Sequence, residues 1–226
     1  MEKYTPMLAT NHFRNNSDHY TRVTAQLSAT RQKFTDSTIG EKVRLLQKSH
    51  AFAVLSVQTP VSAHETAFRN LFANGLPLSE QEIRDSINMV NYYKNKASYI
   101  WDSLQKGRSW EKAANLLTNR KFDEAHRYIL DTFKGVGPAK SPFVMSMLGF
   151  TEKMCIDTNV AQIAEIEPPK TVVVQKYENI VEGIKNQFKT LAKETGSSFL
   201  FQWALFDYKR GDLSNHEVFY REMGII

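Results

Sequence analysis

The strongest constraint on the fold is a helical repeat of apolar residues that recurs along most of this 226-residue chain. Between residues 41 and 57 the apolar side chains follow a spacing of about 3.6 residues, and the pattern resumes after Pro60. Only 10 glycines and 7 prolines are present, so tight turns are few and the elements are long. The pattern predicts an all-α fold of about ten helices, without a β-hairpin.

The length fits one large domain, or two small ones that share a cleft. Cys155 is the single cysteine, which excludes a disulfide framework and any cluster held by cysteines alone. We see no signal peptide at the N-terminus and no apolar run long enough to span a membrane, so we expect an intracellular protein that is not secreted. The six histidines show neither H-x-x-x-H nor H-E-x-x-H spacing, and we predict no metal or cofactor.

The net charge of +5 is unevenly distributed along the chain. The first 150 residues carry 20 basic and 13 acidic side chains, whereas the last 76 carry 9 and 11. A basic region on a protein of this kind indicates a polyanionic partner such as nucleic acid. A general bias of the surface toward solubility is the alternative explanation.

The segment 133–140 has the composition of a phosphate-binding turn. Gly135 and Gly137 stand two apart, with Val136 between them, and Lys134 and Lys140 flank the turn. Consecutive backbone N–H groups beside a helix N-terminus form a favourable site for an anion. The alternative is a tight turn between two helices that needs its glycines for steric reasons alone.

Asp157 follows an apolar stretch, at the expected start of a helix. It suits a structural N-cap. The same position suits a carboxylate that must stay ionised, because a helix N-terminus lowers the pKa of an acid. Such a carboxylate near a bound phosphate can stabilise a sugar cation while an N-glycosidic bond breaks.

At these residues the sequence resembles the helix-hairpin-helix DNA glycosylase superfamily, known as HhH-GPD, whose best-known members are endonuclease III and the adenine glycosylases. The resemblance covers residues 45–165 approximately and rests on four segments in the family's order. They are Val54-Leu55-Ser56-Val57-Gln58-Thr59, Tyr93-Lys94-Asn95-Lys96-Ala97-Ser98-Tyr99-Ile100, Gly135-Val136-Gly137 and Ile156-Asp157-Thr158.

The resemblance implies a single domain over 1–226, built of two helical lobes with DNA bound across the cleft. Residues 45–165 would form the glycosylase core, and 1–44 and 166–226 would add flanking helices. The sequence Glu167-Pro168-Pro169 by itself indicates a linker. The iron–sulfur cluster of the endonuclease III branch needs four cysteines, so the resemblance implies a member without it.

The family pattern also assigns roles to individual residues. Asp157 would stabilise the developing oxocarbenium ion and activate the attacking nucleophile. Gln58 would fill the gap left by a flipped base, with a helix-terminal amide that caps the break at Pro60 as the alternative. The hairpin would hold phosphate through its backbone N–H groups, helped by Lys134, and Lys96 would be a solvated charge or face phosphate.

Lys140 departs from the pattern by one residue. Lyase members carry a lysine directly after G-x-G-x, where this chain has Ala139. One residue on a helix is a rotation of about 100°. Lys140 is therefore either the Schiff-base nucleophile, redirected by Pro138 and Pro142, or a phosphate contact.

These features predict a monomeric DNA glycosylase of base excision repair that flips and excises a damaged or modified base, with AP lyase activity if Lys140 is the nucleophile. The alternative on the same fold is a phage-type hypermodification enzyme that transfers an amine or amino acid to an activated modified thymine. A third hypothesis, a DNA-binding module without catalysis, does not explain Asp157.

Overall fold

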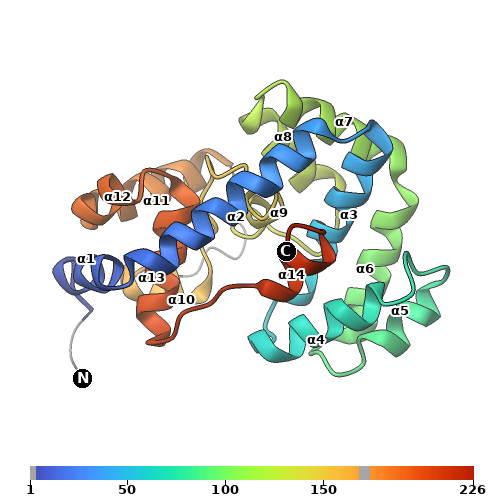
Figure 1. Cartoon of the computed structure of the whole chain (residues 1–226), viewed down its shortest axis with the longest axis horizontal. Helices are drawn as coiled ribbons and strands as arrows, with labels where there is room; N and C mark the ends of the chain where they lie inside the picture. The colour runs from blue at the N-terminus through green and yellow to red at the C-terminus, as the bar shows by residue number, and fades with distance from the viewer. Residues whose placement is uncertain (1–3, 168–173) are drawn as a thin grey trace. The chain divides into compact units, whose positions relative to one another are not determined.

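The computed structural model describes residues 4–167 and 174–226. In these residues the regular secondary structure is helical and includes no β-strand, which confirms the predicted fold class (Figure 1). The described chain forms fourteen helices, more than the ten expected. Among them, none combines the length and the apolar character needed to cross a bilayer.

The chain divides into two compact units, and each is assembled from separate stretches of sequence. Unit 1 comprises the described residues within 1–28 and 137–215, and unit 2 comprises 29–136 and 216–226. The division falls inside one long helix, α2 (Ser17–Asp36), and again between Val136 and Gly137. The prediction of one domain with a core at 45–165 stays a prediction.

Unit 1 packs helices from both ends of the chain, with α13 in its interior. Helix α1 lies along α12 and α13, and α10 packs on α13 (Figure 1). Apart from the shared α2, its helices are α1 (Pro6–Asn15), α9 (Ser141–Ser146), α10 (Thr158–Ile163), α11 (Val174–Gln187), α12 (Lys189–Thr195) and α13 (Ser198–Arg210).

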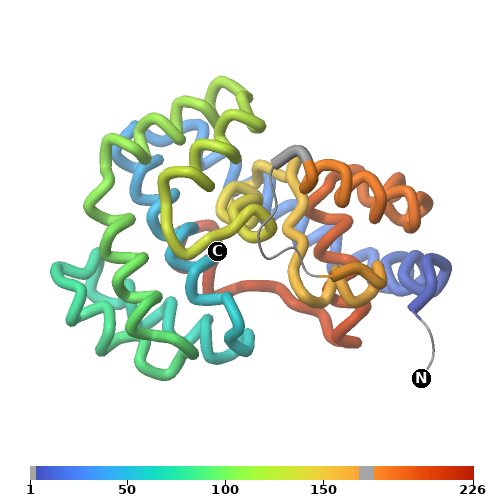
Figure 2. Tube along the Cα trace, turned by 180° about the vertical axis from the view of Figure 1, so that it is seen from behind, coloured from blue at the N-terminus to red at the C-terminus, as the bar shows by residue number. Residues whose placement is uncertain are grey.

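Unit 2 is built around one buried helix, α3, which contacts α4, α6 and α7. Helix α5 lies against α6, and α14, at the very end of the chain, lies against α4 (Figures 1 and 2). Besides the end of α2, its helices are α3 (Ile39–Leu55), α4 (Val61–Phe72), α5 (Glu80–Ser86), α6 (Tyr93–Gln105), α7 (Gly107–Thr118), α8 (Phe122–Thr132) and α14 (Glu217–Glu222).

The helix starts show where local sequence signals succeed and fail. The spacing of Ser79 and Glu82 predicts a capping box at the start of a helix, and Ser79 does cap α5, by accepting a hydrogen bond from Glu82 N–H at 3.1 Å. Ser214 and Glu217 have the same spacing, which predicts a capping box there. That prediction is wrong, because α14 begins only at Glu217 and has no side-chain cap. Ser214 Oγ donates instead to the buried carboxylate of Asp207, at 2.6 Å.

Helices also occupy the two segments that flank the expected core. Residues 1–44 contain α1, α2 and the start of α3. The apolar pattern at 172–191 predicts one long helix. Residues 172 and 173 lie outside the described part of the chain, and the remainder is divided between α11 and α12, with Phe188 between them. The expected linker at 167–169 lies, apart from Glu167, outside the described residues.

Candidate active site

Asp157 is the N-cap of α10 in unit 1. Its extended backbone, at φ −84° and ψ 178°, lets Oδ1 accept a hydrogen bond from Val160 N–H at 2.9 Å. The residue before it, Ile156, donates its N–H to the carbonyl of Ala139 at 3.1 Å. This bond holds the start of α10 beside the turn that carries Lys140.

The electrostatics of Asp157 differ from the sequence expectation. Burial raises the pKa of its carboxyl group, although the positive charge of Lys140 and the backbone N–H groups of Val160 and Asn159 act in the opposite direction. The expected lowering by the helix N-terminus is present, but the loss of water around the half-buried side chain outweighs it. The ionised carboxylate is therefore held in an unfavourable environment, which makes it more responsive to a nearby cation.

Lys140 lies in a turn that precedes α9. The N–H groups of Lys140 and Ser141 both donate to the carbonyl of Gly137, at 2.9 and 2.8 Å, and the helix begins at Ser141. A helical rotation between Ala139 and Lys140 therefore does not apply, because both residues precede the helix. The Lys140 Nζ atom lies 4.6 Å from the centre of the Phe143 ring, and its charge acts on Asp157.

Cys155 is part of the core of unit 1. The residue is 1% exposed, and burial raises the pKa of its thiol to about 12. A thiol with so high a pKa is protonated at neutral pH and is a poor nucleophile.

The two glycines of the hairpin differ in how much space the structure leaves for a side chain. Gly135, in unit 2, has φ +87°, and a Cβ atom there would lie 2.9 Å from side-chain atoms of both Tyr99 and Val54. Gly137, in unit 1, does not have a positive φ, and a Cβ atom there would meet no other atom within 4 Å. Packing therefore requires the first glycine, whereas the second leaves its backbone open to close approach from outside.

The backbone of the hairpin is held from within unit 2 by a residue that the sequence reading missed. His50 is fully buried against Trp110 and Phe133, and its Nε2–H donates to the carbonyl of Lys134 at 2.9 Å. Burial lowers the pKa of His50 to about 4, so the ring is neutral at pH 7. The side chain of Lys134 itself is exposed.

Three consecutive N–H groups of this segment, those of Gly135, Val136 and Gly137, are left unused. No acceptor within the described chain bonds to them. The side chain of Val136 is buried, at 6% exposure, so the turn offers its backbone rather than this side chain to a ligand. Such a run of N–H groups suits an anion.

Gln58 occupies the loop between α3 and α4 in unit 2. The residue is exposed and has a left-handed backbone, at φ 51°, which is uncommon for a residue with a side chain. Asn91 Nδ2 donates to its carbonyl at 2.6 Å. The alternative role as a helix cap fails, because the N-cap of α4 is Pro60 and no side chain caps it.

Lys96 supports this loop from inside. Its ammonium group donates to the carbonyls of Leu55 and Val57, at 3.0 and 2.6 Å, and to Thr59 Oγ1 at 2.7 Å. The residue is 4% exposed. The expectation that Lys96 is solvated or faces phosphate is therefore wrong, because its ammonium group is buried and bonded to two carbonyls and one hydroxyl around Gln58.

The predicted site residues are thus distributed over both units. Unit 1 brings Asp157 and Lys140 together. Gly137 also belongs to unit 1. Unit 2 contains the other predicted residues, which are Gln58, Lys96, Lys134, Gly135 and Val136.

Solved structures share this architecture. The 8-oxoguanine glycosylase/lyase of Methanocaldococcus jannaschii, crystallised with a 15mer DNA that contains 8-oxoguanine, superposes with a TM-score of 0.69 over 91% of this chain and 99% of that one. The chain has the fold of a DNA glycosylase. The 8-oxoguanine DNA glycosylase of Thermotoga maritima gives a TM-score of 0.70 over 92% of this chain and 99% of that one.

The glycosylase fold is shared at low sequence identity, 15% with each of these two proteins. A second structure of the Methanocaldococcus jannaschii enzyme is 16% identical, with a TM-score of 0.62. No protein-family model and no curated protein sequence matches the chain. The resemblance read from four short segments is therefore confirmed at the level of the fold.

We predict that Lys96→Met destabilises the protein by about 1–3 kcal/mol, because it leaves buried acceptors around Gln58 without a donor. Urea unfolding measures the change. Lys94→Met is the matched control, since Lys94 is exposed on the same helix, and it should stay within about 0.5 kcal/mol of wild type. Equal stability of the Lys96 variant and wild type would contradict the supporting role.

Proposed function

We propose that the protein is a DNA N-glycosylase that excises a damaged or modified base, acting as a monomer on DNA inside the cell. The observation that carries the proposal is Asp157, the N-cap of α10, with the charge of Lys140 acting on it, within a chain that has the glycosylase fold. The neighbours in fold are named for 8-oxoguanine, so this base is the first substrate to test.

Asp157 has the properties that the reaction needs. When the bond between the sugar C1′ and the base nitrogen breaks, its electron pair leaves with the base and the sugar becomes an oxocarbenium ion. A carboxylate fixed by Val160 N–H and poorly hydrated interacts strongly with such a cation. The same carboxylate can accept the proton of an attacking water.

Lys140 offers a second nucleophile in the same unit. Its amine can attack C1′ in place of water and form an imine, after which the DNA strand can be cut by β-elimination. The helix start at Ser141 supports this role, because it leaves Lys140 in a turn rather than on a face of α9. Contact with phosphate alone remains the alternative role.

DNA binding is assigned to the hairpin and to Gln58. The unused N–H groups at 135–137 and the exposed side chain of Lys134 suit a phosphate. Gln58 is presented by a loop that Lys96 and Asn91 hold in an unusual backbone conformation. Such a fixed, exposed amide can fill the space of a base that has flipped out.

The alternative function on this fold is base modification. The reaction product distinguishes it from base excision. The decisive experiment is mass spectrometry of duplexes with single modified bases, 8-oxoguanine and activated thymine derivatives among them, after incubation with the protein. Release of free base and formation of an abasic site support the glycosylase. A mass change with an intact glycosidic bond would replace that proposal with the modification enzyme.

We predict that Asp157→Asn lowers turnover by about 10²-fold or more while DNA affinity is retained, because the charge that stabilises the cation is lost. Single-turnover kinetics and a binding titration on the same duplex measure the two effects. Activity within tenfold of wild type would remove Asp157 from the mechanism.

The same variant should be at least as stable as wild type at pH 7. The pKa of Asp157 is higher in the native state than in the unfolded chain, so ionisation at neutral pH opposes folding. As the pH falls through the raised pKa, native Asp157 takes up a proton and this penalty disappears. The stability difference between variant and wild type should therefore shrink toward acidic pH, in thermal melts recorded as a function of pH.

The hairpin glycines supply a matched pair of variants. Gly135→Ala should destabilise the fold by about 1–3 kcal/mol, because of its positive φ and the contacts with Tyr99 and Val54. Gly137→Ala should leave stability unchanged but weaken DNA binding severalfold, because a methyl group obstructs the approach of phosphate. Unfolding curves and salt-matched titrations with duplex DNA measure both, and normal DNA affinity in Gly137→Ala would contradict the phosphate site.

Borohydride trapping on an abasic duplex tests whether the amine of Lys140 attacks the sugar. We predict a covalent protein–DNA adduct in wild type and none in Lys140→Ala, because only an imine can be reduced to a stable bond. An adduct that persists in the variant would assign the chemistry to another amine. No adduct in either protein would identify a monofunctional glycosylase that uses water.

A further inference from the structure

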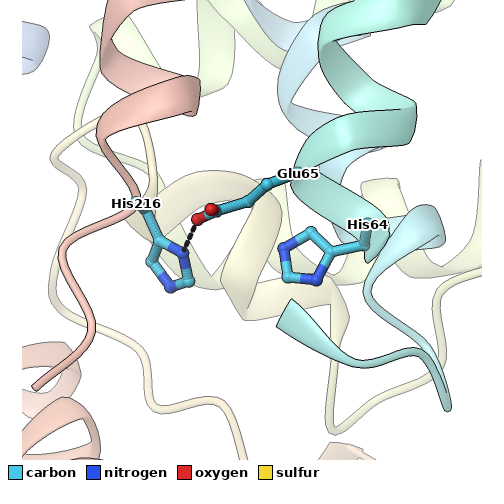
Figure 3. Close-up of side chains that lie close together, drawn as sticks. All are labelled: His64, Glu65 and His216. Carbon is cyan, nitrogen blue, oxygen red and sulfur yellow. Dashed lines mark hydrogen bonds and ion pairs between the residues drawn. The ribbon is translucent and has the colours of Figure 1, made fainter. Parts of the chain in front are cut away.

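Three side chains of the kinds that bind transition metals converge in unit 2. His64 and Glu65 are consecutive in α4, whereas His216 immediately precedes α14 (Figure 3). One ligand atom from each, two imidazole nitrogens and one carboxylate oxygen, lie within 4.8 Å of one another. None of the three belongs to the proposed glycosylase site.

The spacing of these atoms is close to that of a metal site. Zinc binds nitrogen and carboxylate oxygen at about 2.0–2.1 Å, so two ligands of a tetrahedral ion are about 3.3 Å apart. His216 Nδ1 already lies 3.2 Å from Glu65 Oε1. A ligand nitrogen of His64 lies within 4.8 Å of a ligand atom of each of the other two residues, so binding an ion requires the three side chains to draw closer together.

The surroundings favour a defined geometry. His64 and His216 are 3% and 7% exposed, and the ring of Phe52 contacts both imidazoles edge-on, at centroid distances of 4.8 and 5.4 Å. The Glu65 side chain is 20% exposed, which leaves access for an ion and for a water ligand. The Phe52 ring limits the movement of both imidazoles, and the Glu65 carboxylate is open to solvent, so the three side chains are suited to holding an ion.

The backbone of His216 adds an independent observation. The residue has a left-handed conformation, at φ 49° and ψ 37°, although its side chain does not cap α14. Such a conformation is unfavourable for most residues with a side chain and persists where the surroundings enforce it. Here it directs the imidazole toward Glu65 (Figure 3).

We propose that His64, Glu65 and His216 form a binding site for a divalent transition metal, zinc first, with water as the fourth ligand. Two imidazoles and one carboxylate are a zinc donor set, whereas calcium and magnesium prefer oxygen ligands throughout. The ion would fasten α14 to α4 and thereby close a loop of 150 residues between Glu65 and His216. Its function is structural and is independent of the proposed glycosylase activity.

The experiment titrates zinc into chelator-treated full-length protein without DNA, and repeats the titration with cobalt as a spectroscopic probe and with magnesium as a control ion. We expect one zinc per chain, a cobalt spectrum typical of tetrahedral nitrogen and oxygen ligands, no magnesium binding at the same concentration, and a melting temperature raised by a few degrees when zinc is in excess. Absence of saturable zinc binding would overturn the proposal.

Variants separate this site from adventitious binding. His64→Gln, His216→Gln and Glu65→Gln should each weaken zinc binding at least tenfold and abolish the thermal shift. Glu65→Gln retains an oxygen that can accept from His216, so it keeps the fold and isolates the metal ligand. His12→Gln, in α1, removes a more accessible histidine and should leave zinc binding unchanged. Unchanged binding in folded Glu65→Gln, or its loss in His12→Gln, would overturn the proposal.

Discussion

The candidate active site depends on one backbone hydrogen bond, from Ile156 N–H to the carbonyl of Ala139. It joins two segments of unit 1 that the chain separates by α9 and a loop, and so places Asp157 beside Lys140. The N-cap bond to Val160 then fixes the carboxylate. Position and poor hydration together set the reactivity of this group, because a well-hydrated Asp157 would interact only weakly with a developing cation.

In unit 2, two buried polar side chains form hydrogen bonds to the backbone of the Gln58 loop and of the hairpin. Lys96 donates to the carbonyls of Leu55 and Val57, just before Gln58, and His50 donates to the carbonyl of Lys134 at the start of the hairpin. Both residues are buried, so the loss of either set of bonds would leave a buried polar group without a partner. The exposed residues proposed to meet DNA are thus held by residues that never reach the surface.

Much of this arrangement could be predicted from the sequence. The helical repeat indicated the all-α fold, and four short segments in order identified the glycosylase architecture that solved structures at 15% identity confirm. Local signals were less reliable at helix ends. Ser214 and Glu217 have capping-box spacing, but the N–H and the hydroxyl of Ser214 both donate to the buried carboxylate of Asp207, and α14 begins only at Glu217.

The sequence by itself determined the fold class, the position of Asp157 at a helix start and the two glycines of the hairpin, because periodicity and capping are properties of neighbouring residues. Only the tertiary structure decided what depends on residues far apart in the chain. It turned Lys96 from an expected surface charge into an internal support, gave Gly135 a steric reason through Tyr99 and Val54, and reversed the expected pKa shift of Asp157. It also brought His216 to His64 and Glu65, which no spacing in the sequence indicates, since burial and convergence arise only when distant helices pack.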